Sequence, residues 1–163
     1  MKDIQNRLCK ARIAFQSLHP IWKSSQYSRK TKMRIYNSNV KSVLLYGSEC
    51  WRSTKKDQQK LSAFHHSCLR KICQIFWPKK ISNKNLLEMT KSSCILETIK
   101  QRRLRWLGHV LRMPPTTTAK IGLRWTPQGK RPRGRPKNTW RRTVECELKE
   151  MGLTTGNIKR KVV

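Results

Sequence analysis

Apolar side chains recur every three or four residues along most of the chain, a spacing that predicts amphipathic helices. The first helix is expected over residues 3–18, ended by His19-Pro20, and the second from the capping residue Ser28 to residue 45. Further helices, each with a Ser or Thr that can cap its start, are expected over residues 54–75, 82–89, 93–112 and 139–151. The pattern therefore predicts an all-α fold, a small bundle of about five to six helices.

The helical spacing stops between residues 113 and 138, where Pro, Gly and Thr become frequent. Within that stretch, residues 121–125 could form a short strand. We therefore expect three parts. They are a helical domain over residues 1–112, a basic Pro/Gly/Thr-rich linker or arm over residues 113–138, and a C-terminal basic helix with its tail over residues 139–163.

Charge changes this picture more than any other property of the sequence. The chain has 38 Lys and Arg against 8 Asp and Glu, a net charge of +30. Such an excess is most readily relieved by a polyanion, so we expect DNA and/or RNA as the partner. Residues 101–163 hold 17 of the cations, 11 of them Arg, whose planar fork matches phosphate oxygens. We expect the two terminal segments to bind and residues 57–100 to pack.

Carboxylates are too few for most enzyme chemistry. The chain has two Asp and six Glu, with no paired aspartates to hold two metal ions, and no GxxxxGK(S/T), HExxH or GxSxG motif. Glu145 and Glu147 lie two apart on a helix, which favours a surface charge pair, and His109 has no carboxylate near it in sequence. We expect no enzyme activity, no cofactor and no small-molecule substrate.

The six Cys lack CxxC pairs, so we interpret them as reduced thiols. The densest group of soft-metal ligands is His65, His66, Cys68 and Cys73. On a helix His65 and Cys68 share a face whereas Cys73 points elsewhere, which favours helix packing over a zinc site. We expect no metal.

Apolar runs are short, the longest being residues 43–46, so we expect no membrane span and no secretion signal. The chain is expected to be intracellular. Residues 130–137 can serve as a basic import signal, which favours the nucleus.

Two basic clusters are the candidate nucleic-acid contacts. Residues 102–106 interleave three Arg with Trp106, which we expect to face the core. In residues 132–136 the Pro-Arg-Gly-Arg-Pro pattern matches an AT-hook, which lies in the minor groove of A·T-rich DNA; phosphate contact alone is the other interpretation. The candidate residues are Arg102, Arg103, Arg105, Lys130, Arg131, Arg133, Arg135, Lys137, Arg141 and Arg142.

Four sequence blocks carry a recognisable pattern: residues 43–51 (VLLYGSECW), 64–72 (FHHSCLRKI), 102–112 (RRLRWLGHVLR) and 129–140 (GKRPRGRPKNTW). In order and spacing they closely resemble the C-terminal region of endonuclease–reverse transcriptases of non-LTR retrotransposons. The resemblance covers roughly residues 2–151.

This resemblance implies a helical thumb with a basic extension that holds template–primer or target DNA. The paired aspartates of the family's palm and its endonuclease carboxylates have no counterpart here, so we expect a fragment without its own catalytic centre. Two alternatives remain open. In the first, the chain is a domesticated, AT-hook-like architectural protein. In the second, it is a decayed element with no selected function.

Overall fold

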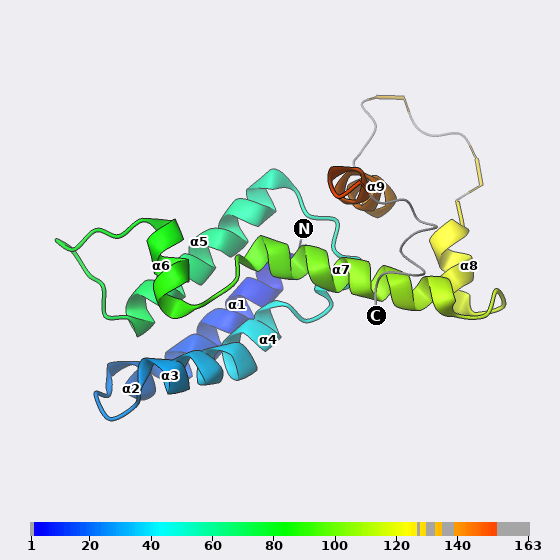
Figure 1. The fold of residues 1–163 in the computed structure, drawn as a ribbon. Coiled ribbons are helices and arrows are strands. Elements are labelled where there is room, and N and C mark those ends of the chain that lie inside the picture. The colour runs from blue at the N-terminus through cyan, green and yellow to red at the C-terminus, as the bar shows by residue number, and fades with distance from the viewer. Residues whose placement is uncertain (1, 127, 130–132, 135–138, 153–163) are drawn as a thin grey trace. The chain divides into compact units, whose positions relative to one another are not determined.

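Figure 1 shows the fold in a computed structural model, which describes residues 2–126, 128–129, 133–134 and 139–152. Every regular element within these ranges is helical, which confirms the predicted all-α fold. No helix in the described part of the chain is both long enough and apolar enough to cross a bilayer.

The chain separates into two compact units, and each has its own interior. Unit 1 consists of Met1–Gly47 and Ser53–Ile99, and unit 2 consists of Ser48–Arg52 and Lys100–Val163. The expected domain end at residue 112 therefore falls inside unit 2.

Unit 1 is built from short and medium helices. Its core contains Phe15, Trp22, Tyr36, Leu61 and Leu69, all buried. Its elements are α1 (Lys2–Ser17), α2 (His19–Lys23), α3 (Arg29–Ile35), the π-helix η1 (Tyr36–Lys41), α4 (Ser42–Leu44), α5 (Lys55–Ile72), α6 (Asn83–Thr90) and the first turn of α7 (Ile95–Arg112).

Predicted caps open three of these helices. Ser28 accepts a hydrogen bond from the backbone N–H of Thr31, and Ser82 accepts one from that of Asn85, both at 3.2 Å. At α5, Thr54 forms a capping box with Asp57. These starts are confirmed, because a side-chain oxygen satisfies a backbone N–H that the first turn leaves without a partner.

The N-terminal half differs from the expectation in two places. The first helix, α1, ends at Ser17, just before His19-Pro20 as expected, but the short helix α2 begins there, because proline is tolerated in the first turn of a helix. Trp22 of α2 is buried and its indole N–H donates to the carbonyl of Phe15 at 2.8 Å. The helix expected from Ser28 to residue 45 contains the π-helical segment η1, which places Tyr36 and Val40 in the core.

A buried polar pair lies inside unit 1. The Tyr36 hydroxyl and Nδ1 of His65 are 2.8 Å apart, and both side chains are inaccessible to solvent. Burial, reinforced by the charges of Lys41 and His66, lowers the pKa of His65 to about 3. The described residues form no group of three or more His, Cys, Asp or Glu side chains that could hold a metal ion.

Unit 2 has a smaller core. Leu104 and Leu107 of α7 pack with Val144 and Leu148 of α9, and Leu123 covers one side. The other elements of unit 2 are the 3-10 helix η2 (Ser48–Cys50), α8 (Thr118–Arg124) and α9 (Trp140–Glu150). The predicted cap Thr139 accepts a hydrogen bond from the backbone N–H of Arg142 at 3.3 Å.

The α8 helix replaces the short strand suggested for residues 121–125, so that expectation was wrong. Ala119 and Leu123 lie four residues apart on one face of α8, and Leu123 packs against the core. On the same helix, the Lys120 ammonium donates to the carbonyls of Leu111 and Met113, at 3.1 and 2.6 Å. These contacts fix a helical turn where residues 113–138 were expected to be irregular.

Candidate nucleic-acid interface

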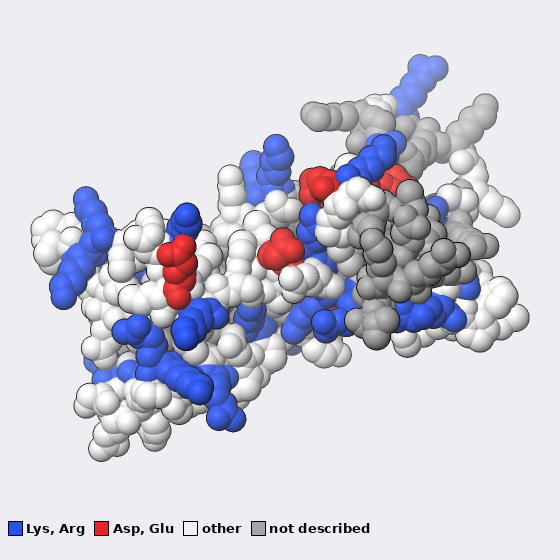
Figure 2. Space-filling view, viewed as in Figure 1, with Lys and Arg blue, Asp and Glu red and all other residues white. Residues whose placement is uncertain are grey.

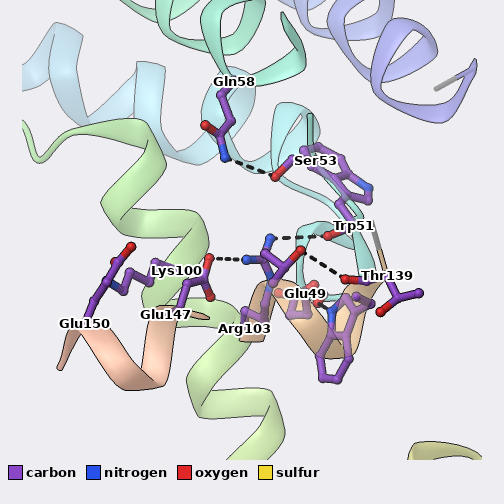
Figure 3. A network of polar contacts seen from close by, with 11 residues as sticks. Glu49, Trp51, Ser53, Gln58, Lys100, Arg103, Thr139, Glu147 and Glu150 are labelled. Carbon is purple, nitrogen blue, oxygen red and sulfur yellow. Dashed lines mark hydrogen bonds and ion pairs between the residues drawn. The ribbon is translucent and has the colours of Figure 1, made fainter. Parts of the chain in front are cut away.

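Arg103 lies inside unit 2 and not on its surface. It is 1% exposed, on the side of α7 that faces α9. Its guanidinium pairs with the carboxylate of Glu147, and Nη2 also donates to the carbonyl of Trp51 at 3.2 Å (Figure 3). This placement does not fit a phosphate contact, so Arg103 is not part of the candidate interface.

The same contact corrects the interpretation of Glu145 and Glu147 as a surface charge pair. The Glu145 side chain is exposed, whereas the Glu147 side chain is 16% exposed and turned toward Arg103. A second ion pair joins the same two helices one turn further along, between Lys100 and Glu150 at 3.0 Å. Two of the carboxylates of unit 2, those of Glu147 and Glu150, therefore hold α9 against α7.

The other candidates on α7 differ in exposure. Arg105 is exposed, and Arg102 is half-buried. Residues 102 and 105 lie three apart on one face of α7, whereas Arg103 is buried on the side toward α9, so no single surface can use all three guanidiniums. Arg105 is the member of this cluster best placed for a partner.

Trp106 is half-buried at the edge of the core, which corrects the expectation of a core position. Its ring meets that of Trp140 edge to face, with centroids 5.4 Å apart. The indole N–H of Trp140 donates to the carbonyl of Glu49 at 2.7 Å. Trp106, Trp125 and Trp140 all line one hollow of about 540 Å³ in unit 2.

The two candidate arginines of α9 also differ in exposure. Arg141 is half-buried and donates to the backbone carbonyl of Trp125, which it helps to hold at the hollow. Arg142 is exposed. Arg142 and Arg105 are thus the two exposed candidates on the helices of unit 2.

Part of the basic arm lies within the described residues. Arg133 is exposed, and Gly134 adopts φ +126°, a conformation that residues with a side chain rarely take. Lys130, Arg131, Arg135 and Lys137 lie outside the described residues. The conformation of Gly134 gives a physical reason for glycine at the centre of the Pro-Arg-Gly-Arg-Pro pattern.

Cationic side chains outnumber carboxylates on the described surface. In Figure 2, Lys and Arg side chains spread over the face shown, and Asp and Glu form a few isolated patches. Burial raises the pKa of the Cys68 thiol to about 12 and lowers that of His65 to about 3, so neither is charged at neutral pH. The chemistry offered by this surface is the binding of anions.

Sequence reasoning missed cations and aromatic residues in unit 1. Lys71 of α5 is exposed, and Phe76 and Trp77 follow the same helix with exposed rings. The adjacent aromatic residues after Lys71 were the available signal, but the low net charge of residues 57–100 favoured a packing role.

Comparisons with known proteins give two similarities. Residues 14–46, from the last part of α1 through α4, match a domain of unknown function, DUF6451. The chain is also 26% identical over 125 residues to a transposon-derived protein of Caenorhabditis elegans. That similarity covers 74% of this chain and 45% of the relative, so the chain spans less than half of the relative's length. No solved structure matches the chain.

Proposed function

We propose that this chain is a transposon-derived nucleic-acid-binding segment without its own catalytic centre. It contacts DNA and/or RNA mainly through phosphates, with no membrane and no small-molecule substrate involved. The observation that carries this proposal is the net charge of +30 together with exposed arginines on the helices of unit 2, Arg105 and Arg142. Two of the few acidic side chains of unit 2, Glu147 and Glu150, pair with Arg103 and Lys100. They therefore do not neutralise the exposed arginines.

Its origin is supported by two sequence similarities. The relative from Caenorhabditis elegans is transposon-derived, and the four sequence blocks resemble the C-terminal region of non-LTR retrotransposon endonuclease–reverse transcriptases. We infer that the chain corresponds to the thumb and basic extension of such an enzyme. A nuclear location follows from that role.

A salt titration of binding tests the phosphate mechanism. The affinity for a duplex should fall steeply as salt rises, because each phosphate contact releases a counterion. The double variant Arg105→Gln/Arg142→Gln should reduce the slope of log affinity against log salt by about two units. Lys55→Gln/Lys56→Gln removes the same charge from exposed positions of α5 and serves as the matched control.

A flat slope for the unaltered chain would remove the electrostatic mechanism. An equal loss in the α5 control would show that total charge matters and these arginines do not. A decayed element with no packed fold would fail at an earlier step, since it would show no cooperative helical transition in a thermal melt followed by circular dichroism.

The AT-hook-like alternative is favoured by one observation, the left-handed φ of Gly134 beside the exposed Arg133. In that function the arm lies in a narrow minor groove, and the chain prefers A·T tracts over G·C duplex. Competition by a minor-groove drug would reveal it. Equal affinity for both duplexes, unaffected by the drug, leaves phosphate contact as the mechanism.

A further inference from the structure

Three adjoining hollows lie around Lys71 in unit 1. The first, of about 460 Å³, is lined by residues of α1 and α5. The second, of about 660 Å³, is lined by α1, α2, the end of α5 and the residues after it. The third, of about 600 Å³, is lined by α5, by the residues that come after α5 and by the first residue of α6. Lys71 lines all three, so they adjoin one another at its side chain, and together they are called here the Lys71 groove.

The Lys71 groove is basic. Exposed cations line it from three helices: Arg12 of α1, Lys23 of α2, and Lys60 and Lys71 of α5. None of its described lining residues is acidic. A concave surface with cations on both sides attracts a linear polyanion more strongly than the same charges on a convex surface.

Two exposed aromatic rings lie at one end of the groove. Phe76 lines two of the hollows and is 60% exposed, and Trp77 lines one and is 84% exposed. Neither ring packs into the core of unit 1, so packing does not explain two adjacent aromatic residues here. Aromatic rings beside a basic groove are typical of surfaces on which unpaired bases stack.

Hydrogen bonds hold the segment that carries these rings. Arg70 donates to the side-chain oxygen of Asn83 at 2.6 Å and to the carbonyl of Ile81 at 3.4 Å. The Gln74 side chain donates to the carbonyl of Lys23 at 3.3 Å, which ties the end of α5 to the end of α2. Arg70 therefore positions the segment, and the exposed cations of the groove remain for a ligand.

We propose that the Lys71 groove binds single-stranded nucleic acid. Arg12, Lys60 and Lys71 contact its phosphates, and unpaired bases stack on Phe76 and Trp77. A duplex fits less well, because its bases are already stacked on one another and offer no face to the rings. This inference rests on the proposed function in taking nucleic acid as the partner, but it assigns the single strand to unit 1.

Fluorescence anisotropy of the full chain with a labelled oligo(dT) of about 20 nucleotides tests the groove, and a labelled duplex of equal length is measured beside it. Trp77→Ala should weaken oligo(dT) binding about tenfold and leave duplex binding unchanged. Lys71→Gln should also weaken oligo(dT) binding and reduce its salt slope by about one unit. The matched control is Tyr27→Ala, which removes an exposed aromatic ring of unit 1 outside the groove.

The outcomes separate this inference from the proposed function. If Trp77→Ala and Lys71→Gln bind oligo(dT) as the Tyr27→Ala control does, the groove assignment is overturned while nucleic-acid binding stands. If the unaltered chain binds neither probe, both proposals fall. If labelled polyglutamate binds as tightly as oligo(dT) and loses affinity in the same variants, the ligand is an acidic peptide and the single-strand assignment is overturned. Thermal melts of each variant should match that of the unaltered chain, because both substituted side chains are exposed.

Discussion

At the scale of single residues, burial decides which cations are available to a partner. Arg103 belongs by sequence to an Arg-rich cluster, yet its guanidinium is enclosed with Glu147 and the carbonyl of Trp51. Removing a guanidinium from water costs several kcal/mol unless a partner compensates it. The ion pair with Glu147 therefore makes this position of α7 structural.

Replacing Glu147 by Gln should lower the free energy of unfolding by about 3 kcal/mol, because it leaves the Arg103 charge buried without a counter-charge. The double variant Arg103→Met/Glu147→Leu removes both charges and should recover most of that loss. Urea denaturation followed by tryptophan fluorescence measures both effects. A double variant less stable than Glu147→Gln would contradict this account of the pair.

His65 makes the stability of unit 1 dependent on pH. Burial lowers its pKa to about 3 in the folded chain, against about 6.5 in an unfolded one. Between these values the unfolded state binds the proton and the folded state does not, so acid favours unfolding. The stabilisation is complete above about pH 7 and is lost as pH falls toward 3.

The free energy of unfolding should therefore drop by about 2 kcal/mol between pH 7.5 and pH 5. His65→Gln should flatten this dependence, whereas His109→Gln, at an exposed position of α7, should keep it. Denaturation curves at several pH values provide the measurement. Parallel curves for the two variants would exclude His65 as the cause.

At the scale of elements, α5 depends on how it begins. The Thr54 backbone N–H and hydroxyl donate to the Asp57 carboxylate at 3.2 and 2.8 Å, and the Asp57 N–H donates back to the hydroxyl at 3.3 Å. Because α5 carries Lys60 and Lys71, this cap also supports the groove.

Thr54→Ala should destabilise the chain by about 1 kcal/mol, since the first turn of α5 loses its side-chain acceptor. Thr54→Ser keeps the hydroxyl and should cost much less. The midpoints of thermal melts compare the two variants. Equal losses would mean that the methyl group of Thr54, and not its hydroxyl, stabilises the start of α5.

At the scale of the whole molecule, the net charge opposes the compact state. A net charge of +30 on 163 residues repels itself in the folded state. Salt screens that repulsion, and it screens the attraction to phosphate as well. Stability and binding should therefore respond to salt in opposite directions.

Raising sodium chloride from about 20 mM to about 200 mM should raise the melting temperature of the free chain, as the Debye length falls below the spacing of its charges. Over the same range the affinity for nucleic acid should fall. Calorimetry at each salt concentration tests the first effect. A melting temperature that stays constant or falls would show that self-repulsion does not limit stability.

The sequence alone determined the all-α fold, the starts of the capped helices and the sign of the net charge. These properties are local or additive: a cap such as Ser28 or Thr139 acts within three residues, and charge is a sum over the chain. Tertiary structure decided how individual side chains are used. Arg103 is buried because α9 packs on α7 and brings Glu147 to it. The two residues are 44 positions apart, so their pairing cannot be seen in the local sequence. Residues 121–124 are helical because Leu123 packs on a core formed by other helices. The Lys71 groove exists because α1 and α2 lie beside α5, and helical spacing cannot show which helices become neighbours.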